Sequence, residues 1–294
     1  MGDLVFDIGM HNGDDTAYYL ARGYRVVAVE ASPVMCAAAQ ERFAREINSS
    51  QLSVRNIGIA ESRGEMDFWV SSHTEWSSFH AENATKGGAQ AASIEVKTIP
   101  FEQLIEEEGT PFFVKIDIEM NDSLCLRSLA TTKSRPAFLS IESSVNADAD
   151  IKLLENLGYS YFKCVRQNDL REITPRNVVY QEELRRGLVA LETRPRLIGR
   201  VLRRLHYRRR SLNGWSFNHG SSGPLGVELP GRWLSSEEML SVWHQLIAYD
   251  LRLDSGGLGE WFDIHAAHRT AAADRTEGLP SSGAQCGADA QPAR

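Results

Sequence analysis

The sequence predicts an α/β protein built on a mostly parallel, doubly wound sheet, and two observations lead to this fold class. Residues 4–8 form an apolar run of strand length that ends at Gly9, and a helical segment then leads to a second apolar strand at residues 25–30. Strand and helix patterns continue to alternate to about residue 165, which is typical of parallel strands joined by helical crossovers. The N-terminal part of the chain is therefore expected to fold as one α/β core.

Each element of this core follows from its own pattern. Asp14 and Asp15 stand where the first helix would begin, and Pro33 opens a second helix that is expected to run to about Ile47. Further strands are predicted at residues 52–60, 64–70, 94–98, 111–119, 137–142 and 159–165. Further helices are predicted at residues 101–107 and 148–157, and a loop at 71–78.

The alternation breaks after the core. From about residue 168 to 255 the composition shifts towards arginine, tryptophan and glycine, and the α/β rhythm returns only at residues 260–265. We interpret the chain as a core (1–167), an insertion that caps the site (168–255), a last core strand (256–269) and a disordered tail (270–294). The tail is rich in alanine, glycine, serine and proline, which cannot bury enough apolar surface to order a chain.

Within the insertion, residues 196–210 contain no acidic residue. Seven arginines alternate there with Leu197, Ile198, Val201, Leu202 and Leu205, a spacing that predicts a basic amphipathic helix. Three interpretations stay open: a solvated helix packed by its leucines, contact with an anionic substrate or carrier, and contact with a membrane surface or nucleic acid.

The length and composition indicate a soluble globular domain that is large enough to be an enzyme. The chain has 294 residues, 42% of them hydrophobic, and a net charge of −7, which gives no reason to expect nucleic acid as a partner. No stretch approaches the roughly 20 apolar residues of a membrane span, and the N-terminus enters a strand without a signal-peptide pattern. The four cysteines are widely spaced and suit a reducing compartment, so a cytoplasmic location is expected.

The turn after the first strand predicts a nucleoside cofactor. Glu30 ends the second strand about 20 residues past the turn, where a carboxylate can accept hydrogen bonds from both ribose hydroxyls. A dinucleotide turn requires G-x-G-x-x-G, but His11 occupies the second glycine position, and Asp14 and Asp15 would repel a pyrophosphate. The cationic S-adenosylmethionine fits this acidic turn better, with NAD or a flavin dinucleotide as the alternative.

These residues carry a family resemblance. The segments Phe6-Asp7-Ile8-Gly9 to Gly13, Glu30-Ala31-Ser32-Pro33 and above all Lys115-Ile116-Asp117-Ile118-Glu119 resemble the FkbM-type S-adenosylmethionine-dependent methyltransferases. The resemblance covers about residues 4–165 and the strand near 260–266. It implies a Rossmann-like sheet with an antiparallel last strand, and methyl transfer to a hydroxyl of a sugar or secondary metabolite. Met120 stands where the family usually has glycine, a departure that bears on the shape of the pocket.

The cofactor residues expected from this chemistry are Asp7, Gly9 and Gly13 at the methionine end, Glu30 at the ribose, and His11 and Asp117 beside them. Methyl transfer to an alcohol also needs a base, and a positioned base contributes about 10²- to 10⁴-fold. Asp117 and Glu119 are expected on one face of a strand end, and Glu142 ends the next strand, so Asp117 and Glu142 are base candidates. A Mg²⁺ site is the less favoured alternative for these acids together with Asn121 and Asp122, and no metal is expected.

His219 is the third candidate base, because it lies in a polar, glycine-rich loop between aromatic residues, although the loop could equally be a connector. The expected partner is a small hydroxylated acceptor, with an anionic or carrier-linked one as a variant. Three function classes remain: an O-methyltransferase, which is favoured, an NAD-dependent oxidoreductase, and a noncatalytic S-adenosylmethionine-binding partner protein.

Overall fold

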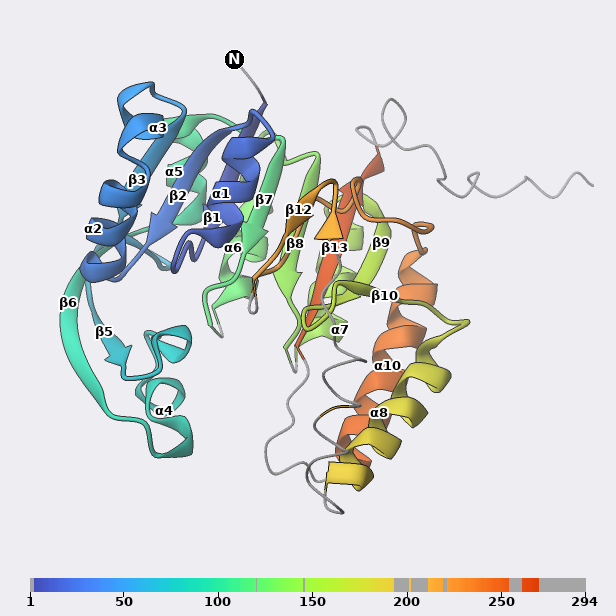
Figure 1. The fold of residues 1–294 in the computed structure, drawn as a ribbon. Coiled ribbons are helices and arrows are strands. Elements are labelled where there is room, and N and C mark those ends of the chain that lie inside the picture. The colour runs from blue at the N-terminus through green and yellow to red at the C-terminus, as the bar shows by residue number, and fades with distance from the viewer. Residues whose placement is uncertain are drawn as a thin grey trace, which may run out of the picture.

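The computed structural model describes residues 3–119, 121–144, 146–192, 201, 211–218, 221–253 and 261–269. Within them, eight strands form the main sheet in the order β10-β9-β13-β8-β7-β1-β2-β3 (Figure 1). Their bounds are β1 Leu4–Ile8, β2 Arg25–Glu30, β3 Leu52–Asn56, β7 Phe113–Ile116, β8 Phe138–Glu142, β9 Tyr159–Arg166, β10 Arg171–Ile173 and β13 Phe262–His268. The predicted α/β class and Rossmann-like sheet are confirmed.

Strand directions also match the prediction. β1 pairs in parallel with β2 and β7, β2 with β3, and β7 with β8. β13, the last strand in sequence, inserts between β8 and β9 and is antiparallel to both. β10 adds a short edge strand antiparallel to β9.

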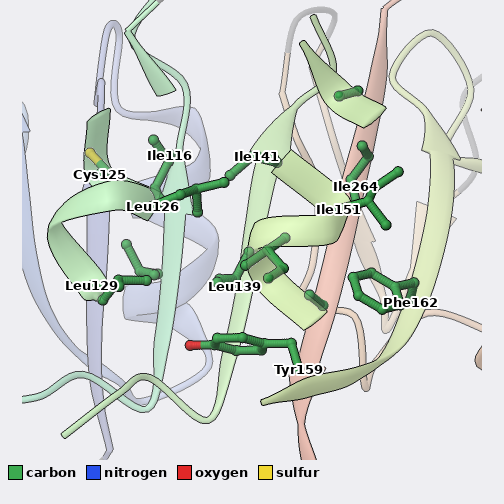
Figure 2. Close-up of a cluster of buried hydrophobic side chains, with 14 of the residues drawn as sticks. Ile116, Cys125, Leu126, Leu129, Leu139, Ile141, Ile151, Tyr159, Phe162 and Ile264 are labelled. Atoms are coloured by element: carbon green, nitrogen blue, oxygen red, sulfur yellow. The ribbon is translucent and has the colours of Figure 1, made fainter. Parts of the chain in front are cut away.

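Helices cover both faces of the sheet. On one face α5 (Phe101–Glu108), α6 (Asp122–Leu129), α7 (Ala147–Asn156) and α10 (Ser236–Leu253) bury their apolar sides, and α8 (Val178–Glu192) packs beside α10. Figure 2 shows this core, in which Leu126 and Ile151 contact the layer formed by Ile116, Ile141 and Ile264. The opposite face is covered by α1 (Asp14–Ala21), α2 (Pro33–Arg42), α3 (Ala44–Asn48) and residues 212–218 and 221–233.

A second sheet, which the sequence did not reveal, stands beside the carboxyl ends of β1, β2 and β7 (Figure 1). It contains β4 (Gly58–Ile59), β5 (Gly64–Ser71) and β6 (Ala91–Ile99) in the order β4-β6-β5. The strand predicted at 52–60 is therefore wrong as one element, because the Ile57 N–H bonds back to the Arg55 carbonyl and ends β3. A Cβ at Gly58 would collide with the Phe79 ring, so glycine is needed where the second sheet begins.

Two other predicted elements are shorter than expected. The helix from Pro33 divides at Phe43 into α2 and α3, and the strand expected at 111–119 is regular only over β7. Asp117 and Glu119 consequently lie in a loop after the strand, where Glu119 has a φ of 45°.

The segment predicted as an insertion forms elements on both faces and at one edge of the main sheet. Its described parts form β10, α8, a hairpin of β11 (Ser211–Leu212) and β12 (Trp215–Ser216), a stretch packed on α1, and α10. Apart from Val201, the arginine run at 196–210 lies outside the described residues, as do Met120, His219 and the tail at 270–294. None of the helices in the described ranges is long and apolar enough to cross a membrane.

Candidate functional site

A cavity of about 340 Å³ opens at the carboxyl ends of the parallel strands, between the main sheet and the second sheet. Open α/β sheets place ligands at this edge, where the loops leave the strands. Its lining comes from the turn after β1, the end of β2, the loop after β7, the end of β8 and the segment after β5. The candidate residues that line it are Gly9, His11, Glu30, Asp117, Glu119 and Glu142.

The glycine turn is fixed by close backbone packing. Gly9 has a φ of 84°, donates its N–H to the Val29 carbonyl, and would clash with the Asp117 carbonyl if it carried a Cβ. Gly13 has a φ of 78° at the start of α1, where a Cβ would come within 2.7 Å of the Phe43 ring. Both positions therefore favour glycine.

Glu30 lies at the end of β2 with its carboxylate oriented by backbone donors. Its Oε2 accepts the His11 N–H and its Oε1 accepts the Ser32 N–H, each at 2.8 Å. Burial raises the pKa of Glu30 despite these two donors. Each oxygen retains acceptor capacity towards the cavity, since a carboxylate offers about four lone-pair sites.

Lys115 compensates the buried acids beside the turn. Its Nζ donates to the Gly9 carbonyl at 2.7 Å and lies 3.2 Å from Asp7, 3.7 Å from Asp117 and 3.9 Å from Asp15. Burial lowers the pKa of Lys115, but the three carboxylates outweigh it and hold this pKa above its usual value. Among the described lining residues, Lys115 is the one lysine or arginine, and its side chain is 4% exposed.

Two of the cofactor candidates, Asp7 and Gly13, lie behind the glycine turn and outside the lining of the cavity. Asp7 is fully buried, accepts a hydrogen bond from Thr16 Oγ1 at 2.6 Å and faces Lys115, so it does not line the cavity. Gly13 is also absent from the lining, because it lies against Phe43. Both residues shape the turn from behind it.

The expected acidic rim is present. Asp117 and Glu119 both line the cavity, although as loop residues and not as alternate residues of a strand. Glu142 ends β8 directly opposite Asp263 of β13, which places both carboxyl groups on the same face of the sheet. Burial raises the pKa of Glu142 well above its usual value, and the charges of Asp117 and Glu119 raise it further.

The described residues do not form a metal site. No group of three or more histidine, cysteine, aspartate or glutamate side chains among them has the arrangement to hold an ion. Asp122 turns back to accept the Ile118 N–H at 3.2 Å, and burial raises its pKa to about 7.

Sequence reasoning missed the wall contributed by the second sheet. Its apolar part contains Ile57, Ile59, Phe68, Val70 and Phe79, and Trp76 also lines the cavity. On the other side, the lining includes Gln167, Asn168, Ser221 and Trp261. Two features of the sequence could have indicated these lining residues: a tryptophan in the serine-rich loop at 71–78 and another just before the last strand.

The described part of the 211–233 segment is anchored to the start of α1. Asp15 accepts hydrogen bonds from the Ser221 hydroxyl and from the N–H groups of Ser222 and Gly223, and Asp14 accepts one from Asn218 at 2.8 Å. The carboxylates predicted to repel a pyrophosphate thus also hold this segment beside the cavity.

Residues 7–161 match the family described as the Methyltransferase FkbM domain. Among solved structures, an FkbM methyltransferase from Methylobacillus flagellatus has a TM-score of 0.36 at 16% identity, over 52% of this chain and 37% of that one. A precorrin-6y C5,15-methyltransferase from Geobacter metallireducens has a TM-score of 0.33 at 13% identity, over 56% of this chain and 66% of that one.

A third structure, the 1,6-didemethyltoxoflavin-N1-methyltransferase of Burkholderia thailandensis, has a TM-score of 0.30 at 14% identity, over 56% of this chain and 64% of that one. This chain therefore spans little more than a third of the first of these proteins and about two thirds of the other two. No curated protein matches the sequence.

Proposed function

Because this chain belongs to the FkbM methyltransferase domain family, we propose that it transfers a methyl group from S-adenosylmethionine to a hydroxyl of a small sugar-like or other metabolite acceptor. The observation that carries the proposal is the cavity at the strand ends, where Glu30, an apolar wall and an acidic rim follow one another. These three surfaces suit the ribose, the adenine and the cationic methionine end of the cofactor.

The residues present fit this cofactor. The apolar wall that includes Phe68 and Phe79 offers aromatic side chains against which a purine can pack, and Glu30 retains acceptor capacity for ribose hydroxyls. Asp117 lines the cavity beside the glycine turn, where a sulfonium and an ammonium group would lie. When bound, S-adenosylmethionine supplies an electrophilic methyl group, and this chain supplies the surfaces that orient it.

A dinucleotide fits less well. A pyrophosphate in the turn would lie beside Asp14, which lines the cavity, and the lysine there is already bonded to Gly9 and paired with Asp7. Backbone N–H groups and cations are what favour phosphate at such a turn, and the acidic side chains oppose it. The NAD-dependent alternative is therefore disfavoured.

The acceptor part of the proposal concerns the tryptophans and the polar side chains of the lining. Trp76 and Trp261 line the cavity from opposite sides, and Asn168, Gln167 and Ser221 are hydrogen-bonding types suited to a hydroxylated ring. Because the described lining has an acidic rim and an occupied lysine, we expect a neutral or cationic acceptor in preference to an anionic one.

Glu142 is the proposed base. Burial and the neighbouring acids raise its pKa, which makes its carboxylate a stronger proton acceptor, and it lines the cavity at the rim. Most of the remaining rate enhancement would come from holding donor and acceptor in line, a contribution of up to roughly 7 to 11 kcal/mol. His219 remains a sequence prediction outside the described residues.

Calorimetry with S-adenosylhomocysteine and with NAD tests the cofactor. We expect the former to bind and the latter to leave no heat signal. Release of S-adenosylhomocysteine in the presence of a panel of sugars and phenolic metabolites then tests catalysis. Tight binding without turnover on any hydroxylated acceptor would favour the noncatalytic alternative, and NAD binding would overturn the assignment.

A further inference from the structure

The segment between β5 and β6 forms one wall of the cavity. It contains the short helices η1 (Thr74–Trp76), α4 (Ala81–Ala84) and η2 (Lys86–Gly88), and it carries Thr74, Trp76 and Phe79 into the lining. In Figure 1 this segment projects from the second sheet beneath the strand ends of the main sheet. Its position relative to the main sheet therefore decides the width of the cavity.

The wall contacts the main-sheet loops at two points. At one, Ser78 Oγ donates to the Glu119 carbonyl at 3.1 Å and Asn83 Nδ2 donates to the Glu119 carboxylate at 2.8 Å. At the other, His11 Nε2 and Thr74 Oγ1 are hydrogen-bonded at 2.9 Å. The first point anchors the wall to the loop after β7, and the second ties it to the glycine turn.

His11 also contacts the proposed ribose carboxylate. It has a φ of 50°, an uncommon conformation for a residue with a side chain, and its N–H donates to Glu30 Oε2 at 2.8 Å. Two hydrogen bonds, through the backbone and then the ring of one residue, thus connect Glu30 to the hydroxyl of Thr74.

Thr74 in turn begins the helical turn that holds Trp76. The Ser77 N–H donates to the Thr74 carbonyl at 3.2 Å, and the Trp76 N–H donates to the His73 carbonyl at 2.8 Å. The Trp76 ring is packed by His73, at a centroid distance of 4.5 Å, and by Lys86 Nζ at 5.0 Å from its centroid. Displacement of Thr74 would consequently move the aromatic face that we assign to the acceptor.

We propose that Thr74 is a positioning residue that couples the cofactor's ribose site to the acceptor wall. A ribose bound at Glu30 fixes His11, His11 holds the Thr74 hydroxyl, and the turn then sets Trp76 against the cavity. Because coupling free energies are reciprocal, a wall held in place also raises the affinity for the cofactor. The inference rests on the proposed function, since it takes Glu30 as the ribose ligand.

Hydrogen exchange of the backbone amides in residues 72–80 tests this coupling. Wild type, T74V, T74S and T85V are each measured with and without saturating S-adenosylhomocysteine. Valine keeps the shape of threonine and removes the hydroxyl, whereas serine keeps the hydroxyl. Thr85 is the matched control, because its hydroxyl donates to the Ala81 carbonyl within the same wall and away from the glycine turn.

We expect the ligand to slow hydrogen exchange of residues 72–80 in wild type, T74S and T85V. In T74V the ligand should slow exchange less, by a factor of about two to ten, which corresponds to the loss of one hydrogen bond. The affinity of T74V for S-adenosylhomocysteine should fall by a similar factor. Equal slowing in T74V and wild type would overturn the inference, as would a wild type that binds without slowing. A wild type that binds no S-adenosylhomocysteine would overturn the proposed function as well.

Discussion

Lys115 donates a hydrogen bond to the carbonyl oxygen of Gly9 across 2.7 Å, from one strand to the turn that ends its neighbour. The same ammonium group is 3.2 Å from Asp7, which is fully buried. The lysine of the Lys115–Glu119 segment therefore holds the glycine turn and neutralises the acids behind it. Its role is structural as well as electrostatic.

Removal of this charge should destabilise the protein strongly. Lys115→Met keeps an unbranched chain but leaves Asp7 without its ion-pair partner, and breaking a buried pair costs about 3 to 5 kcal/mol. Urea denaturation measures the change. The matched control is Lys152→Met, because Lys152 forms an exposed pair with Asp148 and such pairs contribute at most about 1 kcal/mol. Equal losses in the two variants would contradict the assigned role.

Glu30 should be required for cofactor affinity. Glu30→Gln replaces an acceptor oxygen with an NH₂ group that faces the backbone N–H of His11 or Ser32, and it removes the charge that would hold the ribose. Hydrogen bonds to charged groups contribute about 1.5 to 3 kcal/mol each, so S-adenosylhomocysteine should bind at least about tenfold more weakly.

Calorimetry gives this affinity, and Glu41→Gln on the exposed side of α2 is the control. If Glu30→Gln bound the ligand as tightly as the control, Glu30 would not be the ribose residue.

The main sheet could be predicted because its signals are local. The apolar runs at β1, β2 and β8 and the acid at Glu30 are each readable within a few residues, and the helix-strand alternation then defines the topology. The second sheet could not be predicted in the same way. A turn at Ile57 interrupts a continuous β pattern without any proline, and the chain leaves the main sheet there.

The site residues likewise divide into those that local sequence patterns indicate and those that depend on contacts between distant parts of the chain. Glu142 and Asp117 were expected near each other because strand ends of a parallel sheet meet at one edge, and both line the cavity. The contact of Asp15 with Ser221 joins positions about 200 residues apart, and nothing in either local pattern indicates it. Asp7 was expected at the cofactor from its position in the motif, which gives no sign of its partner Lys115. In the structure Asp7 is paired with Lys115 behind the turn.

Glu142→Gln should lower kcat by about 10²- to 10⁴-fold and leave S-adenosylhomocysteine affinity nearly unchanged, because it removes the proton acceptor and keeps the side-chain shape. The base works in its ionised form. Since burial and then the neighbouring acids raise the pKa of Glu142, the rate of the wild type should fall as the pH drops through this raised value, above the ordinary range of glutamate near 4.3.

Measurement of kcat as a function of pH, with an identified acceptor, shows whether the rate falls in this way at low pH. A Glu142→Gln variant with near-normal kcat would place the base elsewhere, and the sequence candidate His219 would then be the next residue to replace.

Asp263 should make the stability of the cofactor-free protein fall with rising pH. Burial raises the pKa of its carboxyl well above the usual value, and the charges of Asp117 and Asp15 raise it further. The folded state therefore binds a proton more tightly than the unfolded state. This stabilising contribution is complete below the unfolded pKa of about 3.9 and is lost as the pH rises through the folded value.

Asp263→Asn removes this loss, because the amide carries no charge and its oxygen can still accept the hydrogen bond that Gln167 Nε2 makes at 2.9 Å. The variant should be more stable than wild type at pH 8 by about 0.5 to 2 kcal/mol, the usual range for a well-chosen stabilising change, and the gain should shrink towards pH 4. Thermal unfolding across this pH range gives the difference, with Glu106→Gln on the exposed side of α5 as the control. A gain that did not depend on pH would mean that packing, and not the buried charge, distinguishes the variant from the wild type.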